Sequence, residues 1–148
     1  MDEIMPAKTP TEKIIATPEA PAKKAEPRPS VLIAEDDLFL LKVFQVKFKK
    51  AGFNVISAKD GNETLEKLRT ENPDILLLDL VMPQKSGFEV LEELKRNPGA
   101  KKIPIIIVSN LGQESDVKHA QELGADEYII KANYTLQQIV DLVKKKIA

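Results

Sequence analysis

From residue 30 onward, short apolar runs alternate regularly with longer segments whose apolar residues recur every three or four positions. The apolar runs are four to six residues long, which is typical of strands buried on both faces of a sheet. The longer segments have the spacing of amphipathic helices. We predict strands over residues 31–34, 54–58, 74–79, 103–108 and 127–131. We predict helices over residues 37–51, 62–70, 87–96, 113–123 and 135–147.

Five strands that alternate with five helices through short connections restrict the chain to few architectures. Such alternation predicts an α/β fold with a doubly wound parallel sheet, covered on both faces by right-handed crossovers. In sheets of this kind, functional side chains gather beyond the carboxyl ends of the strands, where the winding direction reverses. Functional residues are therefore expected directly after the strands.

Residues 1–29 differ in composition from this alternating region. They contain six of the ten prolines, and their one notable apolar pair is Ile14-Ile15. A segment of this kind cannot bury enough apolar surface to offset the entropy cost of ordering it. We predict a disordered tail over residues 1–29 and one domain over residues 30–148. The alternative for the tail is a docking segment centred on Ile14 and Ile15.

The overall composition excludes several classes of protein. The formal net charge of −1 implies no general attraction to nucleic acid or to an anionic membrane. No apolar run approaches the roughly 18 residues of a membrane span, and the first residues lack the parts of a signal peptide. The chain has no cysteine, which excludes disulfides and thiolate metal sites. We expect a cytoplasmic protein that binds neither membrane nor nucleic acid directly.

Charged and hydroxyl side chains stand at the carboxyl ends of four predicted strands. They are Glu35, Asp36 and Asp37 after the first strand, Asp79 at the third, Ser109 at the fourth and Lys131 at the fifth. Because the carboxyl ends of parallel strands lie at one edge of a sheet, we expect these side chains to converge on one small pocket.

The chemistry of such a pocket suits phosphoryl transfer onto an aspartate. Clustered carboxylates repel one another unless a cation intervenes, and an oxygen-only cluster is suited to a hard ion, Mg²⁺ above all. A carboxylate can act as a nucleophile toward phosphorus. A lysine and a hydroxyl nearby can bind the oxygens of the transferred group.

Four segments carry a resemblance to a known family. They are residues 31–37 (VLIAEDD), 79–87 (DLVMPQKSG), 104–109 (PIIIVS) and 128–131 (YIIK). In this order and at these strand ends they resemble the motifs of response-regulator receiver domains of two-component signalling, over about residues 30–148. The resemblance implies a flavodoxin-like fold with strand order 2-1-3-4-5.

The resemblance also implies roles for the acidic residues. Asp79 is expected to be the phosphoacceptor. Asp36 is expected to bind Mg²⁺ directly, Glu35 through a water or as an outer ligand, and Asp79 and the backbone carbonyl of Val81 complete the protein's share of the coordination. We expect a regulator that assists its own phosphorylation and dephosphorylation, not an enzyme.

Three further residues have expected roles in switching. Ser109 is expected to move onto a phosphoryl oxygen, Lys131 to bind another, and Tyr128 to change rotamer. The donor would be a sensor histidine kinase or a phosphotransfer protein. Output would be protein–protein contact through the face formed by the fourth helix, fifth strand and fifth helix, or a phosphorylation-dependent homodimer. The given sequence ends after the fifth helix, so we expect either output without a further domain or a chain that is a fragment of something longer.

The sequence departs from the family pattern at two places. Ala132 follows the pocket lysine where the family has proline, so we predict a trans peptide bond at Lys131-Ala132. Val81 and Leu111 border the reacting group and are apolar, so they cannot position an attacking water. We therefore predict slow self-dephosphorylation.

Two tempting residues have plainer interpretations. Asp37 is expected to cap the first helix instead of serving as a third metal ligand. His119 is the one histidine of the chain, and it is expected on the solvent side of its helix.

Three alternative functions remain. The first is a receiver-like interaction module that does not use phosphate, for which Ala132 is the best support. The second is a phosphatase with an aspartyl intermediate, but Val81 stands where such enzymes have a second acid. The third is a flavin-binding relative, whose phosphate the acidic loop after the first strand would repel.

Overall fold

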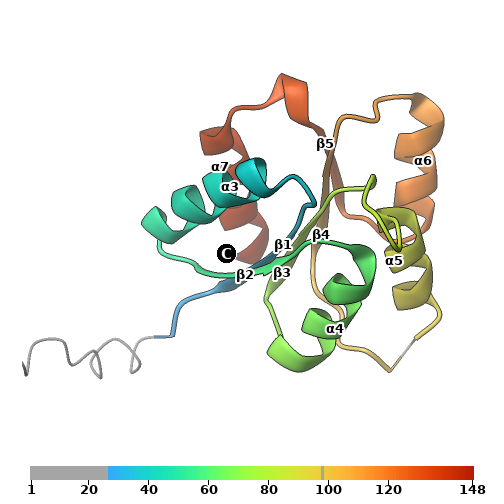
Figure 1. Cartoon of the computed structure of the whole chain (residues 1–148), viewed down its shortest axis with the longest axis horizontal. Coiled ribbons are helices and arrows are strands. Elements are labelled where there is room, and N and C mark those ends of the chain that lie inside the picture. Colours follow the sequence, from blue (N-terminus) through green and yellow to red (C-terminus); the bar gives the residue numbers. More distant parts are fainter. Residues whose placement is uncertain (1–26, 98) are drawn as a thin grey trace, which may run out of the picture.

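A five-stranded parallel sheet forms the centre of the molecule, and helices cover both of its faces (Figure 1). The computed structural model describes residues 27–97 and 99–148. The strands are β1 (Ser30–Ala34), β2 (Asn54–Ala58), β3 (Ile75–Leu78), β4 (Ile105–Ser109) and β5 (Glu127–Ile130). All neighbours pair in parallel, in the order β2-β1-β3-β4-β5. The predicted flavodoxin-like α/β architecture and strand order are confirmed.

Five helices and one short 3₁₀ turn complete the described fold. They are α3 (Leu38–Lys50), α4 (Gly61–Glu71), α5 (Gly87–Lys95), α6 (Glu114–Glu122), α7 (Leu136–Ile147) and the 3₁₀ turn η1 (Lys131–Asn133). Helices α3 and α7 cover one face of the sheet, and α4, α5 and α6 cover the other (Figure 1). This is the doubly wound arrangement expected from strict alternation.

The core consists of two layers that share the sheet. In β3, Ile75 and Leu77 face the layer of α3 and α7, whereas Leu76 and Leu78 face the layer of α4, α5 and α6. All four side chains are buried. A strand covered on both faces needs apolar residues at every position, which explains its unbroken apolar run.

Local signals define the ends of the helices. The side chain of Asp37 accepts hydrogen bonds from the backbone N–H groups of Phe39 and Leu40, so its predicted capping role is confirmed. Gly52 and Gly124 follow α3 and α6 with φ of 96° and 107°, a conformation that favours glycine at helix ends.

Strand β4 begins two residues later than predicted, and both a local and a tertiary feature lie at its start. Pro104 has no N–H to donate, although its carbonyl accepts a hydrogen bond from the Leu76 N–H at 3.0 Å. The Ile105 N–H is bound by the side chain of Asp126 at 2.7 Å. Strand β5 likewise ends at Ile130, so Lys131 belongs to the following turn and not to the strand as predicted.

The predicted tail lies almost entirely outside the described residues, and its disorder stays a prediction. At its end, the carbonyl of Pro29 accepts a hydrogen bond from the Asn54 N–H at 2.9 Å, next to the start of β2. Within the described part of the chain, no helix combines the length and apolar character needed to cross a membrane.

Candidate functional site

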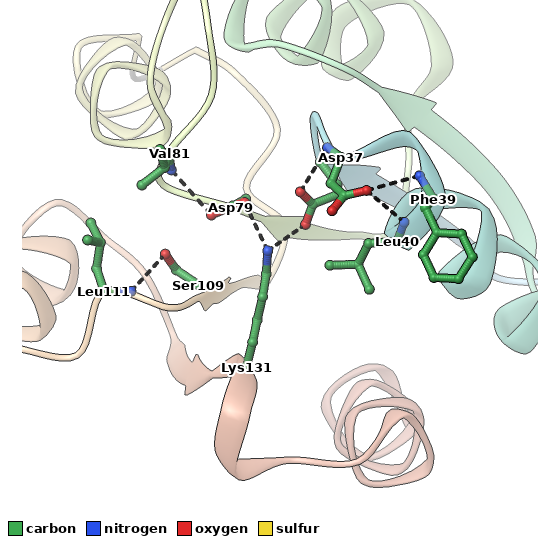
Figure 2. Close-up of polar contacts among 9 residues, drawn as sticks. Asp37, Phe39, Leu40, Asp79, Val81, Ser109, Leu111 and Lys131 are labelled. Atoms are coloured by element: carbon green, nitrogen blue, oxygen red, sulfur yellow. Dashed lines mark hydrogen bonds and ion pairs between the residues drawn. The ribbon is translucent and has the colours of Figure 1, made fainter.

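The carboxyl ends of β1, β3, β4 and β5 meet at one edge of the sheet, and the predicted polar residues lie there (Figure 2). Glu35 follows β1, Asp79 follows β3, Ser109 ends β4 and Lys131 follows β5. Strands β1 and β3 are neighbours although the chain winds away from them in opposite directions. This is the switch point at which doubly wound folds place their sites.

Lys131 connects two buried carboxylates across this edge. Its Nζ donates a hydrogen bond to Oε1 of Glu35 at 2.7 Å and to Oδ2 of Asp79 at 3.0 Å (Figure 2). The exposed fractions of the side chains are 4% for Glu35, 8% for Asp79 and 17% for Lys131. The ammonium group therefore compensates two carboxylates that water barely reaches.

Backbone groups hold the other carboxylate oxygens. The Asp37 N–H donates to Oε2 of Glu35 at 3.1 Å, and the Val81 N–H donates to Oδ1 of Asp79 at 3.2 Å. The first turn of α5 packs directly against the main chain of this region. A Cβ added at Gly87 would overlap the carbonyl oxygen of Asp79, so only glycine allows this approach.

The charges of the site favour a small, hard cation. Carboxylate oxygens of Glu35, Asp36 and Asp79 lie within 4.8 Å of one another, and Asp36 is exposed. Burial and the charge of Asp79 raise the pKa of Glu35, although the hydrogen bond from Lys131 works against this rise. Burial lowers the pKa of Lys131, but the hydrogen bond to Glu35 and the charge of Asp79 outweigh it, and the pKa is raised. Three carboxylates and one ammonium group leave the site with an excess of negative charge, which a divalent cation that prefers oxygen ligands would neutralise.

Ser109 and Tyr128 are joined through one residue of the β4–α6 loop. The Leu111 N–H donates to Oγ of Ser109 at 3.3 Å, and the hydroxyl of Tyr128 donates to the carbonyl of Leu111. Ser109 is fully buried, and among the described residues its own hydroxyl proton has no acceptor. Burial, with the charges of Asp116 and Asp79, raises the pKa of Tyr128. The sequence indicated the two side chains but not the link between them.

Four exposed apolar side chains stand close in the sequence to the site residues, and of these only Val81 was singled out from the sequence. We call them the apolar rim. Its members are large apolar side chains with exposed fractions between 43% and 79%, namely Leu38, Phe39, Val81 and Tyr134. Each lies within three residues of a polar residue of the site (Figure 2 draws Phe39 and Val81). The available signal was that Phe39 falls outside the Leu41, Phe44 and Phe48 stripe that α3 turns to the core.

Two smaller predictions concern the surroundings of the site. The Lys131-Ala132 bond is trans, as predicted, since the described residues contain no cis peptide bond. His119 is exposed, as predicted, but its ring also packs against Phe88 of α5 with centroids 4.8 Å apart.

Comparison with known proteins identifies the family. The family model described as the response regulator receiver domain matches residues 31–144. The chain belongs to the response regulator receiver domain family. This receiver domain is 36% identical over 115 residues to response regulator RR06 of Streptococcus pneumoniae, covering 78% of this chain and 51% of that protein. It is 34% identical over 106 residues to the probable transcriptional regulator ycf27 of Guillardia theta, covering 72% of this chain and 41% of that protein.

Solved structures agree with this assignment. The receiver domain superposes on the phosphorylated cyanobacterial phytochrome response regulator RcpA with a TM-score of 0.68 and 31% identity, covering 80% of this chain and 91% of that one. The chain spans between two fifths and one half of the curated relatives named above. It is therefore a signalling domain of two-component systems, similar in sequence to part of longer regulators.

Proposed function

We propose that this receiver domain is a phosphorylation-dependent switch and that Asp79 accepts the phosphoryl group. The observation that carries the proposal is the setting of the Asp79 carboxylate. It is buried at the switch point of the sheet, Lys131 and the Val81 N–H hold its two oxygens, and two further acids lie beside it. The structure of the similar response regulator RcpA is that of a phosphorylated protein, which supports the proposal.

The proposed reaction is a transfer from a phosphohistidine to Asp79. A carboxylate oxygen forms a bond to phosphorus while the bond between phosphorus and the imidazole nitrogen breaks. The imidazole keeps that electron pair and leaves as a neutral ring when its other nitrogen carries a proton. The product is an acyl phosphate on Asp79. Lys131 would bind one phosphoryl oxygen, and the buried hydroxyl of Ser109 would donate its proton to another.

Magnesium fits the acidic cluster, which offers oxygen ligands alone. Asp36, Asp79 and the backbone carbonyl of Val81 would hold the ion, with Glu35 as an outer ligand. When bound, the ion neutralises charge on the phosphoryl oxygens. Without such a cation, the charge of the phosphoryl group would add to three carboxylates already close together.

The donor is proposed to be a sensor histidine kinase or a phosphotransfer protein. Phosphorus must approach Asp79 from the carboxyl edge of the sheet. Leu38 and Phe39 at the start of α3, Val81 two residues after Asp79 and Tyr134 three residues after Lys131 are exposed, and they offer a macromolecule contact area that a small donor does not need.

Output is proposed to pass through the face of α6, β5 and α7. The N–H of Leu111 donates a hydrogen bond to Ser109, and its carbonyl accepts one from the Tyr128 hydroxyl. If Ser109 moves to bind a phosphoryl oxygen, the Leu111 N–H loses its acceptor, and the residue that holds Tyr128 is released on one side. Phosphorylation would then shift the population between two arrangements of the β4–α6 loop and β5. A partner protein, or a second phosphorylated copy, would bind the favoured arrangement.

Intact mass after treatment with acetyl phosphate and Mg²⁺ tests the proposal. We expect one added phosphoryl group in the parent and none in Asp79→Ala, with Asp141→Ala as a control that loses an exposed carboxylate on α7 and should still gain the group. Near-UV circular dichroism verifies that each variant is folded. A folded parent that gains no mass would contradict the proposal and favour the interaction module that does not use phosphate.

A further inference from the structure

A groove of about 860 Å³ opens at the amino edge of the sheet, opposite the edge that carries Asp79. It is lined by residues of α4, α5 and α6 and by residues at or directly before the starts of β3 and β4. Its floor consists of half-buried apolar side chains, namely Leu65, Leu68, Leu94, Ile103 and Leu123. This volume is within the roughly 300–1,000 Å³ of ordinary ligand pockets. We call it the amino-edge groove.

Four basic and three acidic residues line the amino-edge groove, a net charge of +1. Arg69, Lys101 and Lys102 line it, and none of them forms a salt bridge within residues 27–97 and 99–148. Three acids also line the groove, namely Glu93, Glu122 and Asp126. Glu93 is paired with Lys85, and the side chain of Asp126 already binds a backbone N–H. Lys95 also lines the groove, and its Nζ donates a hydrogen bond to the backbone carbonyl of Glu122 at 2.8 Å. An acidic group entering the groove would therefore meet three cations that have no salt-bridge partner among the described residues, and also the carboxylates of Glu122 and Asp126.

The described chain begins beside this groove. The Ser30 N–H donates to the side chain of Asp74 at 2.7 Å, and the neighbouring Pro73 lines the groove. Adjacent strands are about 5 Å apart, so the start of β1 lies roughly 5–15 Å from the starts of β3 to β5. Twenty-six residues precede Pro27. They are thus attached at the edge that contains the groove.

One stretch of these 26 residues matches the groove in chemistry. Ile14, Ile15 and Ala16 form its most apolar part, and Glu12 and Glu19 stand on either side. Lys13 lies between Glu12 and Ile14, so residues 12–19 carry two acids, one base and a net charge of −1. From Ala16 to Pro27 the chain can span at most about 36–40 Å, which exceeds the distance required. Attachment in the same chain also gives the segment an effective concentration in the millimolar range, so even weak contacts would be populated.

We propose that the amino-edge groove binds residues 12–19 of the same chain, with Ile14 and Ile15 on the apolar floor and Glu12 and Glu19 beside its basic side chains. The contact needs no phosphoryl group and is independent of the function of Asp79. It makes the amino-terminal segment an internal ligand, which an outside partner of this groove would have to displace.

A single spin label tests the proposal in the full-length protein. Because the chain has no cysteine, Ala16→Cys provides one labelling position. We expect the nitroxide to remove most of the NMR intensity of the Leu68 and Leu123 methyl groups and to leave Val143, on the other face, unchanged. Adding Ile14→Asp and Ile15→Asp to the labelled chain should restore that intensity without affecting the folded domain.

Charge reversal provides the second arm. Lys101→Glu with Lys102→Glu should weaken the effect of the label, and adding Glu12→Lys with Glu19→Lys should recover it. Groove methyl groups that keep full intensity would overturn the proposal, as would a loss of intensity that survives the aspartate substitutions. A mixture of spin-labelled protein without isotope label and isotope-labelled protein without cysteine tests for binding between two copies. In this mixture the label can broaden the observed methyl signals only from a second molecule. Broadening in that mixture equal to the broadening within one chain would overturn the assignment to the same chain.

Discussion

Replacing Lys131 with methionine should destabilise the receiver domain more than any surface change. Methionine keeps the apolar part of the lysine side chain and removes the ammonium group. Glu35 and Asp79 would then face each other without the cation that now lies 2.7 Å and 3.0 Å from their oxygens. Both carboxylates are buried, so water cannot replace the lost partner.

The burial of the three groups sets the size of the effect. Breaking a buried ion pair by removing one partner costs roughly 3–5 kcal/mol of unfolding free energy. Glu35 can escape part of this cost by taking up a proton, because its pKa is already raised by burial. We therefore expect a loss of about 3 kcal/mol near neutral pH without a divalent cation, a drop in Tm on the order of 10 °C.

The loss should depend on pH and on Mg²⁺. Without the ammonium group the folded-state pKa of Glu35 rises further, so the folded protein binds the proton more tightly than the unfolded chain. The cost of the substitution is then smallest below the ordinary Glu value of 4.5 and grows as pH rises through the folded-state pKa. Mg²⁺ binding to the folded state should recover part of the loss by linkage.

Urea unfolding at several pH values, with and without Mg²⁺, measures these effects. Lys146→Met is the matched control, since the Lys146 pair with Glu127 is partly exposed and its loss should change little. If Lys131→Met near neutral pH without Mg²⁺ is as stable as Lys146→Met, the argument from buried carboxylates is refuted.

Three further predictions concern single positions. Gly87→Ala should cost roughly 1–3 kcal/mol, because its Cβ would overlap the backbone carbonyl of Asp79. Gly112→Ala should cost less, because its Cβ would meet only the end of the Ile130 side chain, at 3.1 Å. Thermal unfolding compares the two variants, and equal Tm values would contradict this packing argument. Asp37→Ala removes two capping hydrogen bonds and should lower stability by about 1 kcal/mol in urea; an unchanged midpoint would show that the cap is dispensable. Val81→Asn should accelerate loss of the phosphoryl group from Asp79 by providing a polar group for water; an unchanged rate, followed by intact mass, would refute the proposed slow self-dephosphorylation.

Most of the fold and the composition of the site could be predicted from local patterns. The alternation of apolar runs and amphipathic segments specifies five parallel strands, because few architectures bury such elements. That rule also brings Glu35, Asp79, Ser109 and Lys131 to one edge, since they stand at the ends of parallel strands. The Asp37 cap was predictable because its hydrogen bonds reach only two or three residues along the chain.

Other features depend on contacts between residues far apart in the sequence. At the start of β4, the Ile105 N–H binds the side chain of Asp126, 21 residues away, a contact that no local pattern encodes. The same holds for the link from Tyr128 to the Leu111 carbonyl, 17 residues away.

The amino-acid sequence by itself determined which strand ends carry the acids, the hydroxyl and the lysine of the site. The tertiary structure alone decided that Lys131 bridges Glu35 across 96 residues and Asp79 across 52. It also decided that a groove forms at the opposite edge, next to where the described chain begins. The physical reason is that periodicity and capping act over a few residues, whereas burial and ion pairing are properties of surfaces that only the packed sheet and its helices bring together.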